Sequence, residues 1–421
     1  MKNETKQLSV LHDLSRAIVG ASRMEDVCQR ILDRTVNLLS VSKASIMKID
    51  KRDGMLKIVA SKGIPAGVIR DVKVRVGEGI SGKVFKSKKP IMIRDIKATG
   101  FEQKKRYKTS SLISTPVTCF KMKVGGKPVG VINVTDKKGG KHFTGDDLKL
   151  LNTIANQTAS YLHLCDLAED ARESEHVMRE LDLARAIQQR LLPQRIPGVQ
   201  GLDIAGVCLT AEHVGGDYFD VIVGGARPPS VVVADVAGHS ISAAMMMSAF
   251  RSALRSDNTV SLYSPAIIAE RLNNILYDDL ASAEQFISMV YLQVIPGGGN
   301  FGSVIKYTTA GHHPPLILKG NGFIDHSTED ILLGVERFPE YHERRIDVDS
   351  GNIIVLYTDG LVEAADKKGK RFGNERLRGC VRKNKHHSAT KMVELLCLDV
   401  KEFIGKKPLA DDVTVVIIKV K

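Results

Sequence analysis

The chain has 421 residues, of which 43% are hydrophobic and 26% charged, so it is long enough for two or three domains of a water-soluble globular protein. No stretch approaches the roughly 20 consecutive apolar residues of a membrane helix, and no charged-then-apolar leader opens the sequence. The six cysteines are scattered without a CxxC pair, which argues against a structural zinc site and a disulfide framework. We therefore expect a cytoplasmic protein with no membrane span.

The net charge of +13 is concentrated in the first 200 residues, which hold 37 Lys and Arg against 21 Asp and Glu, whereas residues 201–421 hold 24 against 27. Basic runs such as KSKKP (86–90) and EQKKRYK (102–108) could contact nucleic acid or acidic lipid. The sequence lacks a basic stripe interleaved with aromatic residues, which a nucleic-acid platform uses. We favour solvated loops and expect no nucleic-acid partner.

Residues 1–163 alternate between helical and strand-like patterns. Apolar residues recur at helical spacing over 9–41, with a break, and again over 146–164. Between them lie strand-like segments, two of which are separated by KRDG and predict a hairpin: 44–50, 56–63, 90–96, 112–120 and 127–137. The pattern predicts an α+β domain. The glycines of GEGISGKVF (77–85) are read as turns, because Val84 stands where a phosphate-binding loop needs Ser or Thr.

Several stretches of this region together resemble a GAF sensory domain: GEGISGKVF (77–85), KPIMI (89–93), STPV (114–117), GKPVGVINVTDK (126–137) and HFTGDDLKLLNTIANQTA (142–159). The resemblance covers about 150 residues. It implies that residues 1–163 either bind an unidentified small ligand or a regulatory protein, or serve as a dimerisation module.

A helical linker is expected over residues 164–195, because no glycine or proline interrupts the segment before Pro193. A narrow apolar seam runs along it in steps of three and four, formed by Val177, Leu181, Ala184, Ile187 and Leu191. Two interpretations stay open: the seam pairs with a second copy as a coiled coil in a homodimer, or it packs on one of the chain's own domains. A helix without a flexible break could also transmit the state of the first domain to the second.

Residues 196–421 predict a large mixed domain in which helices cover the sheets. Apolar runs indicate strands at 230–236, 286–295, 303–310, 315–320, 352–359 and 413–420. Helical spacing appears at 241–256, 265–280 and 388–404.

Aspartates stand at the ends of strands or in tight turns at four places of this domain: GGDYFD (Asp217, Asp220), VVVADV (Asp235), IIVLYTDG (Asp359) and LADDVTVV (Asp411, Asp412). If these ends converge, they create a dense negative site that needs a cation. Mg²⁺ and Mn²⁺ prefer such oxygen ligands. The glycine pair before Asp217 would let the backbone turn so that this carboxylate faces a metal.

Eight blocks in order make the second region very similar to the RsbU-like branch of the metal-dependent PPM (bacterial type 2C) serine/threonine phosphatases: QQRLLP, VGGDYFDV, VADVAGHSISAAMMMS, TAGHHPPLIL, LLGV, LYTDGLVEA, RFGNERL and DDVTVV. The resemblance implies an α-β-β-α sandwich over 196–421. It implies a site for two Mn²⁺ or Mg²⁺ ions whose ligands are Asp217, Asp235 as the bridging residue, the Val236 carbonyl, Asp359 and Asp411. Asp412, which stands where relatives have Asn, is a further candidate metal ligand, and Asp220 is expected to be structural.

The same resemblance implies a protein serine/threonine phosphatase in which Asp217, Asp235, Asp359 and Asp411 serve catalysis by placing two ions that activate a water. Candidates for the general acid are His239, His312 and His313.

The substrate implied is a phosphorylated STAS-domain protein, an anti-sigma-factor antagonist in a partner-switching pathway that regulates a sigma factor. The alternatives are a catalytically inactive relative that acts as a dimeric signalling scaffold, and a regulator that binds nucleic acid through the basic half. A phosphatase assay with Mn²⁺ separates the first alternative from the enzyme, and a salt-dependent DNA shift would be required for the second.

Overall fold

A computed structural model describes residues 23–65, 69, 72–93, 112–118, 128–224, 228–238, 240–257, 263–295, 303–326 and 330–421. The chain divides into two compact units, Met1–His176 and Val177–Lys421. None of the described helices combines the length and the apolar character needed to cross a bilayer.

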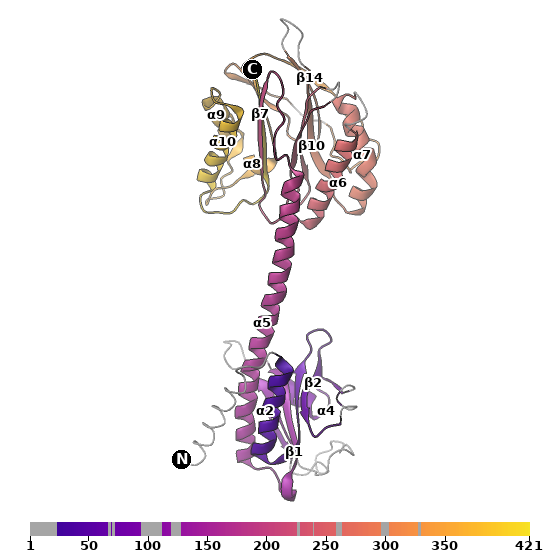
Figure 1. Ribbon diagram of the computed structural model, residues 1–421, viewed down its shortest axis with the longest axis vertical. Helices are drawn as coiled ribbons and strands as arrows, with labels where there is room; N and C mark the ends of the chain where they lie inside the picture. The colour runs from indigo at the N-terminus through magenta and orange to yellow at the C-terminus, as the bar shows by residue number, and fades with distance from the viewer. Residues whose placement is uncertain are drawn as a thin grey trace. The chain divides into compact units, whose positions relative to one another are not determined.

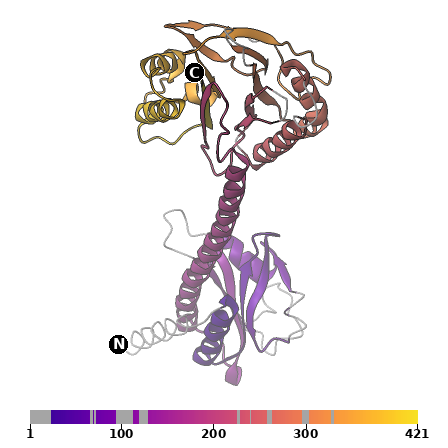
Figure 2. The same cartoon turned by 45° about the horizontal axis from the view of Figure 1, so that its top comes forward.

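The first unit is built on a six-stranded antiparallel sheet in the order β3-β2-β1-β6-β5-β4. Its strands are β1 (Val41–Ile49), β2 (Met55–Lys62), β3 (Lys73–Arg75), β4 (Ile91–Ile93), β5 (Leu112–Thr118) and β6 (Pro128–Lys137). Helix α2 (Met24–Leu39) and the first part of α5 (Gly145–Leu191) cover one face (Figures 1 and 2). The short α4 (Gly79–Ser87) packs on the other face, and a 3₁₀ turn, Lys138–Gly140, follows β6.

The predicted α+β pattern of this unit is confirmed, with one difference in the glycine-rich segment. The KRDG turn joins β1 and β2 as an antiparallel hairpin, and Gly54 adopts the positive φ of 67° that favours glycine. The segment read as glycine turns forms α4, in which a Cβ on Gly82 would overlap the Arg75 carbonyl oxygen. This glycine therefore serves close packing of a helix against its neighbour. The part of the 9–41 helix before Arg23 lies outside the described residues.

The second unit is a sandwich of two five-stranded antiparallel sheets. The first has the order β14-β11-β10-β9-β8 and comprises β8 (Tyr218–Ile222), β9 (Ser230–Val236), β10 (Ile287–Ile295), β11 (Ser303–Ala310) and β14 (Arg344–Val348). The second has the order β13-β12-β15-β16-β7 and comprises β7 (Leu202–Leu209), β12 (Leu316–Lys319), β13 (Gly322–Ile324), β15 (Ile353–Tyr357) and β16 (Val413–Val420).

Three hydrophobic clusters hold the layers of this unit together. The central one lies between the sheets, where for example Val233 and Leu292 face Ile354 and Val416. A second joins the first sheet to α6 (Ile241–Asp257) and α7 (Pro265–Ser282). The third joins the other sheet to α8 (Asp359–Glu363), α9 (Gly373–Lys383) and α10 (Ala389–Ile404), on the opposite side of the sandwich (Figure 1). The expected α-β-β-α architecture is confirmed.

Candidate metal centre

Strand directions bring the predicted aspartates to one edge of the sandwich. In the first sheet, Asp217 directly precedes β8 and Asp235 lies near the end of β9, its antiparallel neighbour. In the second sheet, Asp359 comes two residues after the end of β15. Asp412 directly precedes β16, which is the antiparallel neighbour of β15. Because the beginning of one antiparallel strand lies beside the end of the next, each pair of acids meets at the same sheet edge.

Asp412 connects the two sheets at this edge. Its Oδ2 accepts hydrogen bonds from the amides of Gly216 at 2.9 Å and Asp217 at 3.5 Å, and its Oδ1 accepts one from Ala211 at 2.8 Å. The Asp412 carboxylate, on the second sheet, thus holds the turn that precedes β8 of the first. Burial raises the pKa of this carboxyl.

The two glycines of the turn are required by close approach. A Cβ on Gly215 would overlap the carboxylate of Asp412, and a Cβ on Gly216 would overlap the carbonyl oxygen of Val236. A Cβ on Gly360, just after Asp359, would likewise overlap the carbonyl oxygen of Asp412. Glycine at these positions lets three chain segments that carry acids pack against one another.

Asp217 is buried, with 3% of its surface exposed. Its Oδ2 accepts hydrogen bonds from the hydroxyls of Thr358 at 2.9 Å and Thr414 at 2.6 Å. Burial raises the pKa of Asp217 well above its usual value, and the charge of Asp235 raises it further. Two threonines from the neighbouring sheet therefore fix the orientation of this carboxyl group.

Asp235 and Asp359 line the open side of the cluster. Burial, together with the charges of Asp359 and Asp411, raises the pKa of Asp235 to about 7. The pKa of Asp359 is also raised by burial and by the charge of Asp411. Asp411 is itself exposed and accepts a hydrogen bond from the Asp412 amide at 2.8 Å. This concentration of negative charge favours a divalent cation.

The donor set suits a hard cation, although its ligand shell is not closed. Within the described part of the chain, no group of three or more His, Cys, Asp and Glu side chains is arranged to hold a metal ion. The carboxylates of Asp217 and Asp412 accept hydrogen bonds from hydroxyl and amide groups, whereas those of Asp235 and Asp359 line an open cavity. Carboxylates and the Val236 carbonyl offer only oxygen, the ligand that Mg²⁺ and Mn²⁺ bind together with waters.

Asp220 has partners of its own outside the acidic cluster, which agrees with a structural role. Its carboxylate forms a two-point ion pair with Arg255 at 2.8 and 3.0 Å and accepts a hydrogen bond from the Tyr218 hydroxyl at 2.6 Å. This arrangement ties β8 to the last turn of α6 and satisfies a carboxylate that is 1% exposed.

A cavity of about 340 Å³ opens beside the cluster. It is lined by Asp235, Ala237, Phe286, Ser288, Gly311, His312, His313, Leu332 and Asp359. The cavity therefore places carboxylates, two histidines and a hydroxyl around one space.

The two histidines of the cavity differ in chemistry. His312 is 4% exposed; its Nδ1 lies 2.7 Å from the Ser288 hydroxyl and its Nε2 lies 3.1 Å from the Tyr357 carbonyl oxygen. Only a ring with its proton on Nε2 satisfies both partners, and burial lowers the pKa of His312 to about 3. His313 stacks on the Tyr357 ring at a centroid distance of 5.4 Å. His312 is thus a neutral, structural imidazole, and His239 lies outside the described residues.

Gln188 of helix α5 belongs to the site, and the sequence interpretation assigned it no role. This side chain is buried; its Nε2 donates to the Gly215 carbonyl oxygen at 2.6 Å, and its Oε1 accepts from the Gly215 amide at 3.0 Å. The two-point contact joins the last turns of α5 to the turn that carries Asp217. An amide side chain just before the helix-ending LLP was the available signal.

Comparison with protein families locates two known domains. Residues 21–163 match the model described as GAF domain, and residues 229–421 match the model described as Stage II sporulation protein E (SpoIIE). These matches confirm the two resemblances drawn from sequence motifs.

Among curated proteins, phosphoserine phosphatase RsbU of Bacillus subtilis is 28% identical over 197 residues, which cover 46% of this chain and 57% of RsbU. Protein IcfG of Synechocystis is 26% identical over 264 residues, covering 56% of this chain and 41% of IcfG. The chain thus spans about half the length of these relatives.

Among solved structures, the SiaA-PP2C domain of Pseudomonas aeruginosa superposes with a TM-score of 0.52 at 20% identity. The match covers 60% of this chain and all of that domain. At this identity the likeness shows the fold alone, which is that of a PP2C domain.

Proposed function

We propose that this chain, which carries a GAF domain followed by a SpoIIE/PP2C-type phosphatase domain, is a metal-dependent protein serine/threonine phosphatase. The proposal is supported by the strand ends that carry Asp217, Asp235, Asp359 and Asp411 at one edge of the sandwich, beside a cavity lined by Asp235 and Asp359. The similarity to a relative named phosphoserine phosphatase supports the same reaction class.

The carboxylates of Asp217, Asp235, Asp359 and Asp411, with the Val236 carbonyl, would hold two Mn²⁺ or Mg²⁺ ions. Such ions supply a water nucleophile at neutral pH and neutralise the charge of a phosphoryl group. In this proposal Asp412 contributes mainly by positioning, because backbone amides already occupy its oxygens. Asp217 reaches the site with one oxygen fixed by two threonine hydroxyls.

The chain's own residues would shape the substrate side of the cavity. His313 and Asp359 line the same cavity, so a phosphoserine oxygen bound there would lie beside the His313 ring. As the exposed partner of the pair, it is our candidate for protonating the departing serine oxygen. His312 cannot take that part near neutral pH, because its pKa is lowered to about 3.

The substrate we propose is a phosphorylated STAS-domain protein of a partner-switching pathway that controls a sigma factor in the cytoplasm. The motif resemblance and the relative named RsbU support this assignment. A half-open cavity of about 340 Å³ can admit a phosphoserine presented on a protein surface.

Control by the GAF domain would run through helix α5. We keep the proposed division into the GAF domain (1–163), the linker (164–195) and the phosphatase domain (196–421). The helix is continuous from Gly145 to Leu191, and Gln188 joins it to the Gly215 turn. Val177, Leu183 and Ile187 are at least half exposed, which supports a homodimer through this helix. A small ligand or regulatory protein at the GAF domain would then change the linker.

A phosphatase assay tests the enzyme against the inactive scaffold. We expect the purified chain to hydrolyse an aryl phosphate and a phosphoserine peptide with Mn²⁺, and Asp235→Asn to reduce kcat at least 100-fold while remaining folded. Metal analysis of the parent and the variant by mass spectrometry is the second readout. A folded, metal-binding parent with no turnover of either substrate would favour the scaffold.

A further inference from the structure

We propose that a pocket between α10 and the edge of the second sheet binds a medium-chain aliphatic carboxylate, of the fatty-acid type. The pocket has a volume of about 450 Å³, within the range of roughly 300–1,000 Å³ that small-molecule sites occupy. It is separate from the polar cavity at the metal centre, and no activity in the proposed function uses it.

The pocket is apolar because an amphipathic helix covers the sheet edge only in part. Met392, Val393, Leu396, Val400 and Ile404 of α10 are buried in the core shared with the sheet. Among the described strands, β7 lies at the edge of that sheet and has β16 as its one neighbour. Near the end of β7, side chains of the helix, the strand and the adjoining loop line a hollow.

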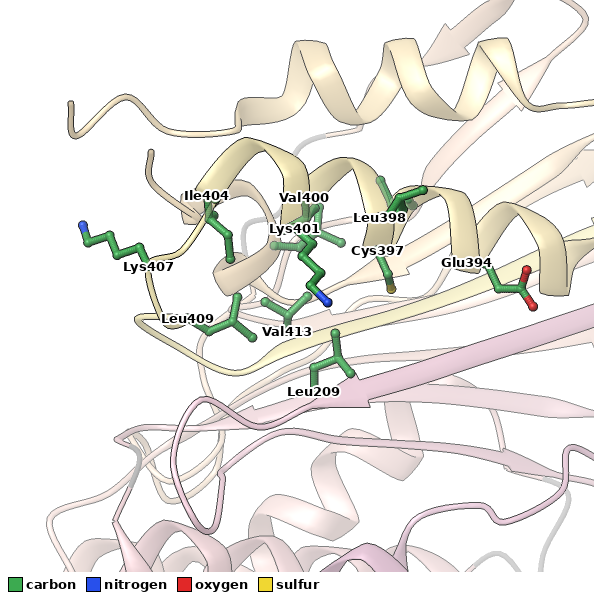
Figure 3. Close-up of a pocket in the computed structure, with 13 residues that line it drawn as sticks. Leu209, Glu394, Cys397, Leu398, Val400, Lys401, Ile404, Lys407, Leu409 and Val413 are labelled. Carbon is green, nitrogen blue, oxygen red and sulfur yellow. The ribbon is translucent and has the colours of Figure 1, made fainter. Parts of the chain in front are cut away.

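Aliphatic side chains from four segments enclose this hollow (Figure 3). Leu209 comes from β7, Val413 from β16, Leu409 from the loop before it, and Leu361 from α8. The wall formed by α10 includes Cys397, which is free and half-buried, and Leu398, which is 50% exposed. A linear alkyl chain fits such a lining, because the walls offer it contacts without polar partners.

The charges at the pocket select an anion. Lys401 lines the pocket, and Figure 3 shows its side chain extending from α10 toward Leu209 and Val413. Among the described residues no ion pair is formed by Lys401, and no acid stands three or four positions from it on the helix. The acid of the lining, Glu394, is paired with Lys391 at 2.9 Å. Lys407 also belongs to the lining, and Figure 3 shows its ammonium directed away from Lys401, so Lys401 is the cation that faces the pocket.

An alkyl carboxylate satisfies both features. Its chain would lie among Leu209, Leu361 and Val413, and its carboxylate would meet the ammonium of Lys401. A phosphate or a nucleotide would leave the apolar lining without a partner, and a neutral hydrocarbon would leave Lys401 unpaired. The lining residues flank the metal cluster in sequence, because Leu361 follows Asp359 and Val413 follows Asp412.

Titration of the full chain with hexanoate, octanoate and decanoate, followed by calorimetry below micelle formation, tests the proposal. We expect one site per chain and an affinity that rises about three- to fourfold for each methylene added until the pocket is full. Decanol serves as the uncharged probe. The proposal fails if decanoate does not bind, or if affinity does not depend on chain length.

Two variants locate the site. Cys397→Trp fills the pocket and is expected to abolish decanoate binding while keeping the unfolding transition of the parent. Lys401→Met is expected to weaken decanoate binding about three- to fivefold and to leave decanol unaffected. Lys406→Met, one residue from the lining, is the matched control and should bind decanoate as the parent does.

Contrary results would be clear. Equal binding of decanoate by Lys401→Met and Lys406→Met overturns the assignment of a carboxylate. Unchanged binding by a folded Cys397→Trp places the ligand elsewhere. A change of oligomeric state in Cys397→Trp, without decanoate binding by the parent, would show that a second copy covers this face. If Cys397→Trp does not fold, the comparison of decanoate with decanol on Lys401→Met decides the matter.

Discussion

Asp412 is the residue whose removal best separates positioning from metal ligation. Its carboxylate accepts three backbone amides from Ala211, Gly216 and Asp217. We expect Asp412→Ala to lower the free energy of unfolding by about 1–3 kcal/mol, because buried amides lose their acceptor. Asp412→Asn keeps one acceptor oxygen and should recover part of that loss.

Denaturant unfolding of the parent and both Asp412 variants measures this effect, and a Mn²⁺ titration shows whether affinity falls with stability. The matched control is Asp411→Ala, which removes an exposed carboxylate and should reduce Mn²⁺ affinity with little change in unfolding. Equal stability of Asp412→Ala and the parent would contradict the positioning role.

The two histidines of the cavity predict opposite phenotypes. His312→Ala should destabilise the phosphatase unit by about 1–3 kcal/mol, because Ser288 and the Tyr357 carbonyl lose a buried partner. His313→Ala should leave unfolding nearly unchanged and reduce kcat about 10²-fold or more, if His313 protonates the leaving oxygen.

The two histidine variants are compared by thermal unfolding and by the pH profile of kcat on a phosphoserine peptide. Loss of the alkaline limb in His313→Ala, with a folded protein, would support the proposed general acid, because such a group acts only while it is protonated. If His313→Ala keeps the parent's kcat and pH profile, the general acid is another group.

His342 provides a pH-dependent contact at the surface. Its Nδ1 lies 2.7 Å from Asp330 Oδ1, and this hydrogen bond, with the charge of Asp330, raises the pKa of His342. A raised folded-state pKa means that the stabilisation is complete below the unfolded value and is lost as the pH rises through the folded value. His342→Gln should therefore lower the unfolding temperature, relative to the parent, more at pH 5.5 than at pH 8.5.

Calorimetric scans of the parent and His342→Gln at the two pH values check this sign. Arg344 also pairs with Asp330, at 2.9 Å, so the carboxylate keeps a partner in the variant. A difference that grows toward pH 8.5 would contradict the assignment.

At the scale of elements, helix α5 and the turn before β8 form one mechanical connection. Gln188→Ala removes both hydrogen bonds to Gly215, and we expect the phosphatase unit to lose about 1–3 kcal/mol of stability and to bind Mn²⁺ more weakly. Gln189→Ala is the matched control, because Gln189 is the exposed neighbour on the same helix turn. Calorimetry with and without Mn²⁺ distinguishes the two variants.

Ala184→Pro tests the same connection one turn earlier. A proline inside a helix removes a backbone hydrogen bond and bends or breaks the helix, which costs about 3 kcal/mol of stability. We expect the isolated activity of the phosphatase unit to remain while its dependence on the GAF domain, and dimerisation, are reduced. Sedimentation and phosphatase assays of the parent, the variant and a chain lacking the GAF domain show whether the relay exists.

Patterning predicted the long elements of the second unit well, and the short ones poorly. Strands β9 and β16 are continuous apolar runs because both faces of each strand are buried, between the other sheet and the covering helices. By contrast, β7, β8, β13 and β14 were missed, as were the helices α8 and α9. Short or half-exposed elements carry few periods of a pattern, and tertiary contacts decide their conformation.

For the whole molecule, divalent metal should couple to folding. We expect Mn²⁺ to raise the unfolding temperature of the phosphatase unit, because the metal binds clustered acids that exist only in the folded state. EDTA should reverse the effect, and Asp235→Asn should abolish it. Scanning calorimetry separates the unfolding transition of the phosphatase unit from that of the GAF unit, which should not respond to Mn²⁺. A response of the GAF transition instead would contradict the proposed metal centre.

The sequence by itself determined the order of the two domains and the acids that stand at the strand ends, and its motif resemblance implied the α-β-β-α architecture of the second domain, because hydrophobic periodicity and short motifs are local properties of the chain. Only the tertiary structure decided which structural or chemical role each residue of the site has. Asp412 holds the turn before β8, His312 is a neutral imidazole, and Gln188 reaches Gly215 from helix α5. These roles depend on hydrogen bonding, burial and charge, and therefore on groups that are distant in sequence. The apolar pocket beside α10 likewise depends on side chains from segments that are distant in sequence, such as Leu209, Leu361 and Lys401.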